Sequence, residues 1–174
     1  MELAVAHLYT HGHRRIALIN GPDNSQSSPL KQKGFLQAMA KRALPVPEVY
    51  QQKGNFSGQG GYQAMQRLLC AAEPPSAVVA AADCMAVGAL RAFQEQGGRC
   101  PEQLSMIGFE DGLLAEYCYP PLTSISAGKE EIGRLACQLL IDQLRQPSLP
   151  DRQLLVAPKL ISRASVRTKP HIGI

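Results

Sequence analysis

Apolar positions along the chain fall into two alternating patterns, one with the spacing of a helix and one with the short runs of a buried strand. Helical spacing covers residues 1–9, 29–42, 62–69 and 83–93. Extended or apolar runs lie between and after these helices, at residues 15–19, 48–52, 77–81 and 104–109. The alternation predicts an α/β fold in which a parallel sheet carries helices on both faces.

The pattern changes after Pro120-Pro121. Residues 122–125 predict a brief extended piece, and residues 129–146 predict a long amphipathic helix that ends before Pro147. Two short strands are predicted beyond it, at residues 154–157 and 159–162. The double proline is a candidate crossover hinge, so the last third of the chain is a candidate for part of a second lobe.

Composition limits the class of protein. The 174 residues are 45% hydrophobic and 18% charged, with a net charge of +4, which suits one packed domain and excludes a disordered chain. No apolar stretch approaches the roughly 20 residues of a membrane span, so no membrane partner is expected. Five scattered cysteines without metal-site spacing predict reduced, small buried side chains in a cytoplasmic protein.

Polar residues follow each predicted strand of the sheet. In an open α/β sheet the ligand lies outside the carboxyl ends of the strands, so these residues are the candidates for a binding site. They are Asp23, Asn24, Ser25, Ser27 and Lys31 after the first strand, Asn55 and Phe56 after the second, Ala82 and Asp83 after the third, and Glu110 and Asp111 after the fourth. Polar groups beside one aromatic ring suit a small hydroxylated molecule. Individually, several also suit helix caps or solvated loops.

Motifs for catalysis are missing from the sequence. It contains no nucleophile elbow, phosphate-binding loop, dinucleotide fingerprint or zinc-protease motif, so neither an enzyme nor a cofactor is expected. His7, His11 and His13 precede the first strand, at the edge of the sheet opposite the candidate site. His11 and His13 have no evident third ligand, so we expect no metal site.

Four stretches share one family pattern in order along the chain. They are AHLYTHGHRRIALINGP (6–22), KGFLQAM (33–39), PPSAVVAAADCMAVGALRAFQEQGGRCPEQLSMIGFED (74–111) and YPPLTSI (119–125). The most specific pieces are D-x-M-A-x-G-A at 83–89 and S-x-I-G-F-[DE]-D at 105–111. Together they resemble the LacI/GalR-type, or lactose/purine-repressor, family of transcription regulators. The resemblance extends along the chain to about Val166.

The resemblance implies a two-lobed effector domain of the type I periplasmic-binding-protein-like fold. Residues 1–120 would form its C-terminal lobe, residues 121–166 would return to the N-terminal lobe, and residues 167–174 would form a tail. Family members begin with a helix-turn-helix, a hinge helix and the first lobe. We expect the helix-turn-helix and most of the first lobe to be absent here, and operator DNA to be bound only through that absent segment.

The family's effector contacts, carried over by the resemblance, fall on Ser27, Lys31, Phe56, Ala82 with Asp83, and Glu110. Lys31 stands where an arginine is common, Ala82 where a polar residue is frequent, and Glu110 where aspartate is usual. Because lysine cannot make the forked contact of arginine, the ligand or its pose is expected to differ from that of a standard neutral sugar. A sugar, a sugar acid and a nucleoside all remain candidates.

Two segments of this chain match those that form the dimer interface in the family. They are a helix at 85–93 and a loop at 112–117. The resemblance therefore places Met85, Val87, Leu90, Leu113 and Tyr117 at a homodimer interface, although the first three also suit a core. The implied function is the effector-sensing and dimerising portion of a repressor. A periplasmic sugar-binding protein of a transport system shares this fold and is the alternative.

Overall fold

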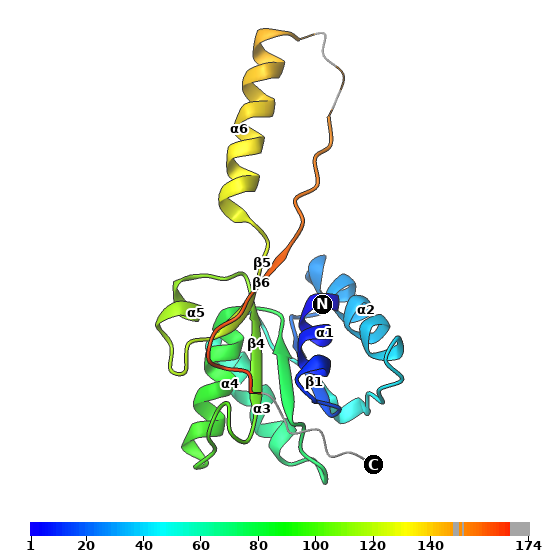
Figure 1. Cartoon of the computed structure of the whole chain (residues 1–174), viewed down its shortest axis with the longest axis vertical. Coiled ribbons are helices and arrows are strands. Elements are labelled where there is room, and N and C mark those ends of the chain that lie inside the picture. The colour runs from blue at the N-terminus through cyan, green and yellow to red at the C-terminus, as the bar shows by residue number, and fades with distance from the viewer. Residues whose placement is uncertain (148–149, 151, 168–174) are drawn as a thin grey trace.

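A computed structural model, which describes residues 1–147, 150 and 152–167, has the expected α/β architecture (Figure 1). Its six strands are β1 Ile16–Asn20, β2 Gln51–Lys53, β3 Ala77–Ala80, β4 Ser105–Phe109, β5 Thr123–Ser126 and β6 Lys159–Ile161. They form one sheet in the order β2-β1-β3-β4-β5-β6. Neighbouring strands from β2 to β5 are parallel, and only β6 pairs antiparallel, with β5.

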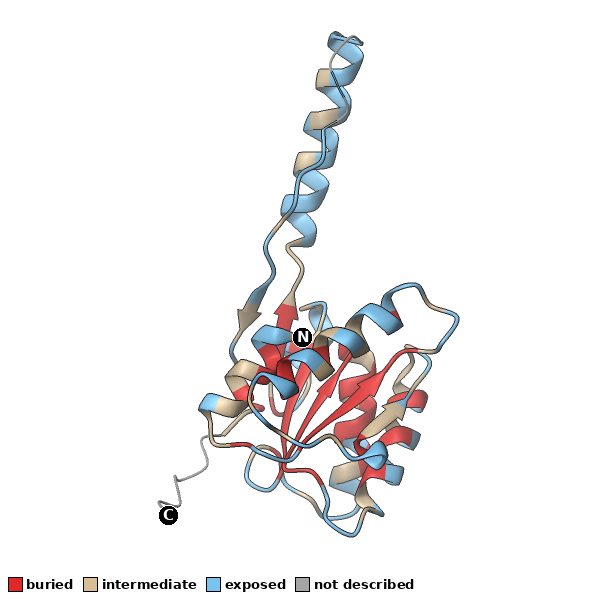
Figure 2. Cartoon of the chain, turned by 90° about the vertical axis from the view of Figure 1, so that its right-hand side faces the viewer, coloured by how far each residue is buried: buried red, intermediate tan, exposed pale blue. Residues whose placement is uncertain are grey.

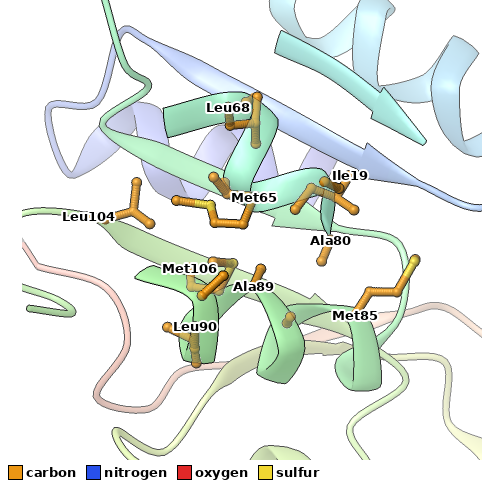
Figure 3. Packing of buried hydrophobic residues seen from close by; sticks show 14 of the residues in the cluster. Ile19, Met65, Leu68, Ala80, Met85, Ala89, Leu90, Leu104 and Met106 are labelled. Carbon is orange, nitrogen blue, oxygen red and sulfur yellow. The ribbon is translucent and has the colours of Figure 1, made fainter. Parts of the chain in front are cut away.

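Helices cover both faces of this sheet. They are α1 Glu2–Thr10, α2 Ser27–Ala40, α3 Gly58–Leu69, α4 Asp83–Glu95, α5 Leu113–Tyr117 and α6 Lys129–Arg145, with a 3-10 turn η1 at Glu48–Tyr50. Successive side chains of a strand point to opposite faces. Ala17 and Ile19 of β1 therefore pack against α3 and α4, while Ile16 and Leu18 pack against α1 and α2. Figure 3 shows the first of these two cores.

Two small residues allow α3 and α4 to pack closely. A Cβ added to Gly88 of α4 would overlap the backbone of Gly58, and one added to Gly61 of α3 would overlap the backbone of Met85. The helices therefore touch backbone to backbone where they cross. This contact orients α4, whose first residue, Asp83, lies at the candidate site.

Helix α6 stands apart from the rest of the fold. It leaves the sheet at the end of β5 and projects into solvent, and the chain returns beside it to β6 (Figure 1). None of its residues is buried, and its apolar side chains Ile132, Leu140, Ile141 and Leu144 are exposed (Figure 2). No helix in the described part of the chain, α6 included, is long and apolar enough to cross a membrane.

The two ends of this excursion lie in the main sheet, as β5 and β6. Assignment of residues 121–166 to a second lobe stays a prediction, and the part of that segment that leaves the sheet lies between Ser126 and Lys159. Of the predicted tail 167–174, only Arg167 is among the described residues.

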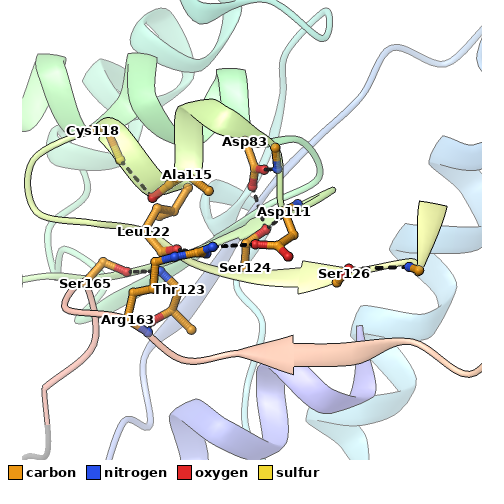
Figure 4. Close-up of polar contacts among 12 residues, drawn as sticks. Asp83, Asp111, Ala115, Cys118, Leu122, Thr123, Ser124, Ser126, Arg163 and Ser165 are labelled. Atoms are coloured by element: carbon orange, nitrogen blue, oxygen red, sulfur yellow. Dashed lines mark hydrogen bonds and ion pairs between the residues drawn. The ribbon is translucent and has the colours of Figure 1, made fainter. Parts of the chain in front are cut away.

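A polar network fastens the returning chain beyond β6 to the sheet (Figure 4). The Arg163 guanidinium lies 2.7 Å from Asp111 Oδ1 and donates a 2.9 Å hydrogen bond to the carbonyl of Leu122. The Ser165 hydroxyl donates to the carbonyl of Met106 at 2.6 Å and accepts from the amide of Thr123 at 2.8 Å. Residues 163–165 therefore bridge β4 and the start of β5.

Some sequence predictions need correction. Residues 113–117 form the short helix α5 and not a loop, and the predicted strand at 48–52 is a 3-10 turn followed by β2. No strand forms at 154–157, because this stretch lies beside α6, away from β5, the strand with which β6 pairs. The remaining predicted helices and strands are confirmed to within a few residues at their ends.

The cysteines were predicted to be buried, and this is wrong for two of them. Cys70 and Cys137 are exposed, Cys84 and Cys118 are half-buried, and Cys100 is buried. Burial raises the pKa of the Cys100 thiol to about 12, so this thiol stays protonated near neutral pH. Cys137 is exposed because α6 has no covering element in the described part of the chain.

Replacing Arg163 with methionine tests the network. The side chains of Arg163 and Asp111 are only 20% and 19% exposed, so Arg163→Met leaves a shielded carboxylate and a carbonyl without their donor. We expect a loss of about 2 kcal/mol in the free energy of unfolding, measured by urea denaturation. The matched control is Arg134→Met, which removes an ion pair with Glu131 from the exposed surface of α6 and should leave the free energy of unfolding nearly unchanged. Equal losses in the two variants would contradict the account.

An alanine at Gly88 tests the close crossing of α3 and α4. The added methyl group meets the backbone of Gly58, so we expect Gly88→Ala to lower the free energy of unfolding by about 2 kcal/mol. Gly133 of α6 has open space around its Cα, and Gly133→Ala should cause no loss. A Gly88→Ala protein as stable as the parent in urea and thermal melts would rule out this crossing.

Candidate functional site

Lys31 links the ends of three strands at the carboxyl edge of the sheet. It lies in the second turn of α2, and its Nζ donates a 2.8 Å hydrogen bond to the carbonyl of Ala81, the residue after β3. The same Nζ lies 4.2 Å from the ring centre of Phe109, the last residue of β4, and 5.6 Å from that of Phe56. An ammonium over aromatic faces is attracted by their negative charge density. The arrangement is a cation held above an aromatic floor.

Burial lowers the pKa of Lys31, while the negative charge of Glu110 acts in the opposite direction. Among the described residues, no carboxylate lies within 4 Å of Nζ, whereas Lys53 and Arg163 each have such a partner. Lys31 is therefore a half-buried cation whose neighbours are a carbonyl and two rings.

Phe56 is held in an unusual backbone conformation. Its φ of 57° lies in the left-handed region, which costs a residue with a side chain about 1 kcal/mol or more. The Cys84 thiol donates to the carbonyl of Phe56 at 3.2 Å, which ties this loop to α4. The ring lies against Gly21, where any side chain would overlap it. Glycine after β1 is thus required for Phe56 to reach the edge of the sheet.

Two buried polar atoms on the residues that flank the turn after β1 have no hydrogen-bond partner among the described residues. They are Oδ1 of Asn20, at the end of β1, and Oγ of Ser28, at the start of α2. Buried polar atoms are nearly always paired, so each of these atoms lacks the partner that such atoms usually have. Ser27, which the sequence predicted as a contact, is the residue before Ser28. It is exposed, and its side chain bonds only to Ser25 in the described structure.

The loop after β4 carries Glu110 and is strained at two consecutive residues. Glu110 has a φ of 116° and Asp111 a φ of 54°. Hydrogen bonds from three successive backbone amides hold the loop. Glu110 N donates to the carbonyl of Ile125 at 2.8 Å. Asp111 N donates to Ser124 Oγ at 3.1 Å, and Gly112 N donates to Asp83 Oδ2 at 2.9 Å. The exposed side chain of Glu110 is therefore presented by a fixed backbone, and Figure 4 shows the contacts of the neighbouring Asp111 and Asp83.

Asp83 serves this loop, which changes the role predicted for it. The side chain is buried, and its second oxygen, Oδ1, accepts a 2.7 Å hydrogen bond from Ser124 Oγ. Both carboxylate oxygens are thus occupied inside the lobe and do not face the candidate site. Ala82, which stands where a polar residue is frequent in the family, is also buried. Its methyl side chain cannot form a hydrogen bond with a ligand. The remaining predicted contacts, Lys31, Phe56 and Glu110, lie together at the edge.

The predicted dimer residues divide between core and surface. Met85 and Leu90 are fully buried in the core between α3, α4 and the sheet, so they present no surface to a partner. This corrects the expectation for those two residues, because the inner face of α4 contacts its own sheet. Val87 is half-buried, and Leu113 and Tyr117 of α5 are 74% and 78% exposed.

Two hollows lie at opposite edges of the sheet. One, of about 710 Å³, is lined by the loop that carries Glu110, the foot of α6 and the returning chain around Val156. The other, of about 390 Å³, lies at the amino edge between Arg15 and Phe93. Only the first hollow includes a predicted contact residue.

The histidines lie away from the candidate site. His13 is buried at the amino edge, where its ring bonds to Ser76 and Ser105, and the rings of His7 and His11 lie 4.1 Å apart at the end of α1. Within residues 1–147, 150 and 152–167, no three metal-binding side chains cluster.

Sequence reasoning missed three contributors to the site. Phe109 was counted only as the end of a buried strand, although its position next to Glu110 places its ring under Lys31. The carbonyl of Ala81 carries no side-chain signal at all. Arg163 lies 52 residues from Asp111, so no local pattern reveals their pairing.

Known proteins match this chain over nearly its whole length. Residues 5–166 match the periplasmic binding protein-like domain family. The HTH-type transcriptional repressor CytR of Escherichia coli (strain K12) is 40% identical over 167 residues, which are 96% of this chain and 49% of CytR. The chain thus spans about half the length of this curated relative.

Solved structures agree with the sequence match. The transcriptional regulator CelR in complex with cellobiose superposes with a TM-score of 0.84 at 32% identity, over 92% of this chain and 49% of that one. The lac repressor dimer bound to operator and the anti-inducer ONPF gives a TM-score of 0.86 at 30% identity, over 95% and 57%. The resemblance seen in the motifs is confirmed: the chain belongs to the periplasmic binding protein-like domain family, in the form found in LacI-type transcription regulators.

Proposed function

We propose that this chain is the effector-sensing and dimerising part of a LacI-type transcriptional repressor. The observation that carries the proposal is the group formed by Lys31, Phe56 and Glu110 at the carboxyl edge of the sheet. Open α/β sheets bind small molecules at this edge, where connections leave neighbouring strands in opposite directions. Here the reversal falls between β1 and β3, the strands that Lys31 links.

The chemistry of this edge suits a small ring compound with hydroxyl groups. Phe56 offers a flat apolar face for stacking, and Glu110, Asn20 and Ser28 offer polar atoms for hydroxyl groups. The similarity to CelR, which binds cellobiose, supports a sugar-like ligand. Sugars, sugar acids and nucleosides form the class of effector proposed.

The comparisons favour a regulator over the other two functions considered. The curated relative is a transcriptional repressor, and the structures that superpose on the chain are transcriptional regulators, whereas a transport binding protein and an enzyme find no such support. We place the protein in the cytoplasm, where a transcriptional repressor acts on its operator, and assign it no catalytic reaction. In this proposal, contact with operator DNA belongs to a helix-turn-helix of the kind that the name of CytR states, and not to the residues described here.

Dimerisation through α5 follows from its exposed apolar side chains. Leu113, Leu114 and Tyr117 lie together on this short helix and are exposed. The similarity to a dimeric lac repressor supports a homodimer at this surface. The exposed apolar face of α6 belongs, in this proposal, against a second lobe. An effector that binds one arrangement of the lobes more tightly would then shift the pair between two states.

The aromatic face of Phe56 is tested with Phe56→Leu, which keeps apolar bulk and removes the ring. We expect the compound that binds the parent chain most tightly, from a panel of hexoses, uronic acids and nucleosides, to bind about tenfold more weakly. Isothermal titration calorimetry gives the dissociation constants. Tyr119→Leu removes an exposed ring elsewhere and should leave binding unchanged. A panel with no binder, or equal affinity in Phe56→Leu and the parent, would overturn the proposed site.

The dimer surface is tested by a charge on α5. Leu113→Asp places a carboxylate in the proposed apolar contact, so we expect sedimentation to show a shift from dimer to monomer. Leu30→Asp puts the same charge on a leucine of α2 that is 72% exposed and should leave the dimer intact. A monomeric parent, or a Leu113→Asp protein that stays dimeric, would count against the interface.

A further inference from the structure

Lys31 has an unusual environment for a cation. It is half-buried, its Nζ contacts one carbonyl and two aromatic rings, and no carboxylate among the described residues pairs with it. Burial lowers the pKa of this amine, and the negative charge of Glu110 opposes that shift only in part. Removing a charge from water is unfavourable unless a partner compensates it, so the site lacks one negative group near Nζ.

Glu110 does not supply that group in this structure. Its side chain is exposed, and its strained backbone is fixed by the bond from its amide to Ile125 O. The influence of Glu110 on Lys31 is smaller than the effect of burial. The carboxylate of Asp83 is likewise unavailable, because Ser124 and Gly112 occupy both of its oxygens.

We propose that the effector is an acidic sugar in ring form, a uronic acid, whose carboxylate pairs with Lys31 while its ring stacks on Phe56. This inference rests on the proposed function and names the ligand class within it. An ammonium 5.6 Å from the centre of the Phe56 ring lies within reach of a substituent on a stacked ligand ring. Lysine provides a compact charge with three donors, of which Ala81 uses one.

The other polar groups at the edge fit hydroxyl groups and not a second acid. Glu110 is an acceptor for hydroxyl donors and would repel a further negative charge. Oγ of Ser28 and Oδ1 of Asn20, at the start of α2 and the end of β1, are buried atoms without a hydrogen-bond partner among the described residues. One acid at Lys31 and several hydroxyl groups elsewhere therefore match the site. A phosphate ester, with up to two negative charges, matches Glu110 less well than a single carboxylate.

The test compares matched ligands on the whole chain. Galacturonate and glucuronate are titrated beside galactose, glucose and glucose 6-phosphate at constant ionic strength, together with the nucleosides of the panel. We expect at least one uronic acid to bind about tenfold or more tightly than its neutral hexose and than the phosphate ester. Higher salt should reduce this difference, because it screens a charge interaction.

Two lysine variants assign the difference to one residue. Lys31→Met should bring the affinities of the uronic acid and its neutral hexose to within about twofold of each other, while Lys33→Met, an exposed lysine on the same helix, should preserve the difference. Thermal melts without ligand confirm that both variants are folded. If neutral hexoses or nucleosides bind through Phe56 at least as tightly as uronic acids, or Lys31→Met weakens acid and hexose equally, the acidic-ligand inference is wrong and the proposed function stands. If no compound binds, both fail.

Discussion

The carboxylate of Asp83 is the contact on which the geometry of the edge depends. One of its oxygens accepts from Ser124 on β5 and the other from the amide of Gly112 after β4. Ser124 in turn accepts from the amide of Asp111, whose own carboxylate pairs with Arg163 beyond β6. A single chain of polar contacts thus joins the start of α4, the loop after β4, β5 and the returning segment. Because these groups are shielded from water, each lost partner leaves a costly unpaired charge or donor.

This network connects the stability of the lobe to its proposed binding site. The loop that it fixes carries Glu110 in a left-handed backbone conformation, which persists only when surrounding contacts hold it. Phe56 is strained in the same way and is held from the other side by Cys84 of α4. Both strained residues lie at the carboxyl edge, where Lys31 spans the reversal in strand order between β1 and β3. Of the four described non-glycine residues with a positive φ, Phe56, Glu110 and Asp111 therefore lie where the ligand is proposed to bind, and Ala43 follows α2.

Periodicity was sufficient for most of the fold, because helices and buried strands repeat with different spacing in the sequence. It failed at residues 154–157, whose extended, apolar sequence has no strand to pair with, and at α5, which is too short to show a period. For the candidate site, the rule that ligands bind at strand ends predicted Lys31, Phe56 and Glu110, and these three residues lie together at the carboxyl edge. The same rule also predicted Asp83 as a ligand contact, although its buried carboxylate bonds to Ser124 and Gly112. A position at the end of a strand does not determine which way a side chain points. The role of Arg163 could not be predicted from a local pattern, because its partner Asp111 lies 52 residues away in the sequence.

The most direct measurement is amide hydrogen exchange on the whole chain, with and without each panel compound at saturating concentration. The account predicts that a binding compound slows exchange at residues 27–31, 54–57, 81–83 and 109–112, which surround the carboxyl edge, and leaves the amino-edge hollow around Arg15 and Phe93 unchanged. Slowed exchange confined to that amino-edge hollow, or none at the carboxyl edge with a compound shown to bind, would contradict the central claim.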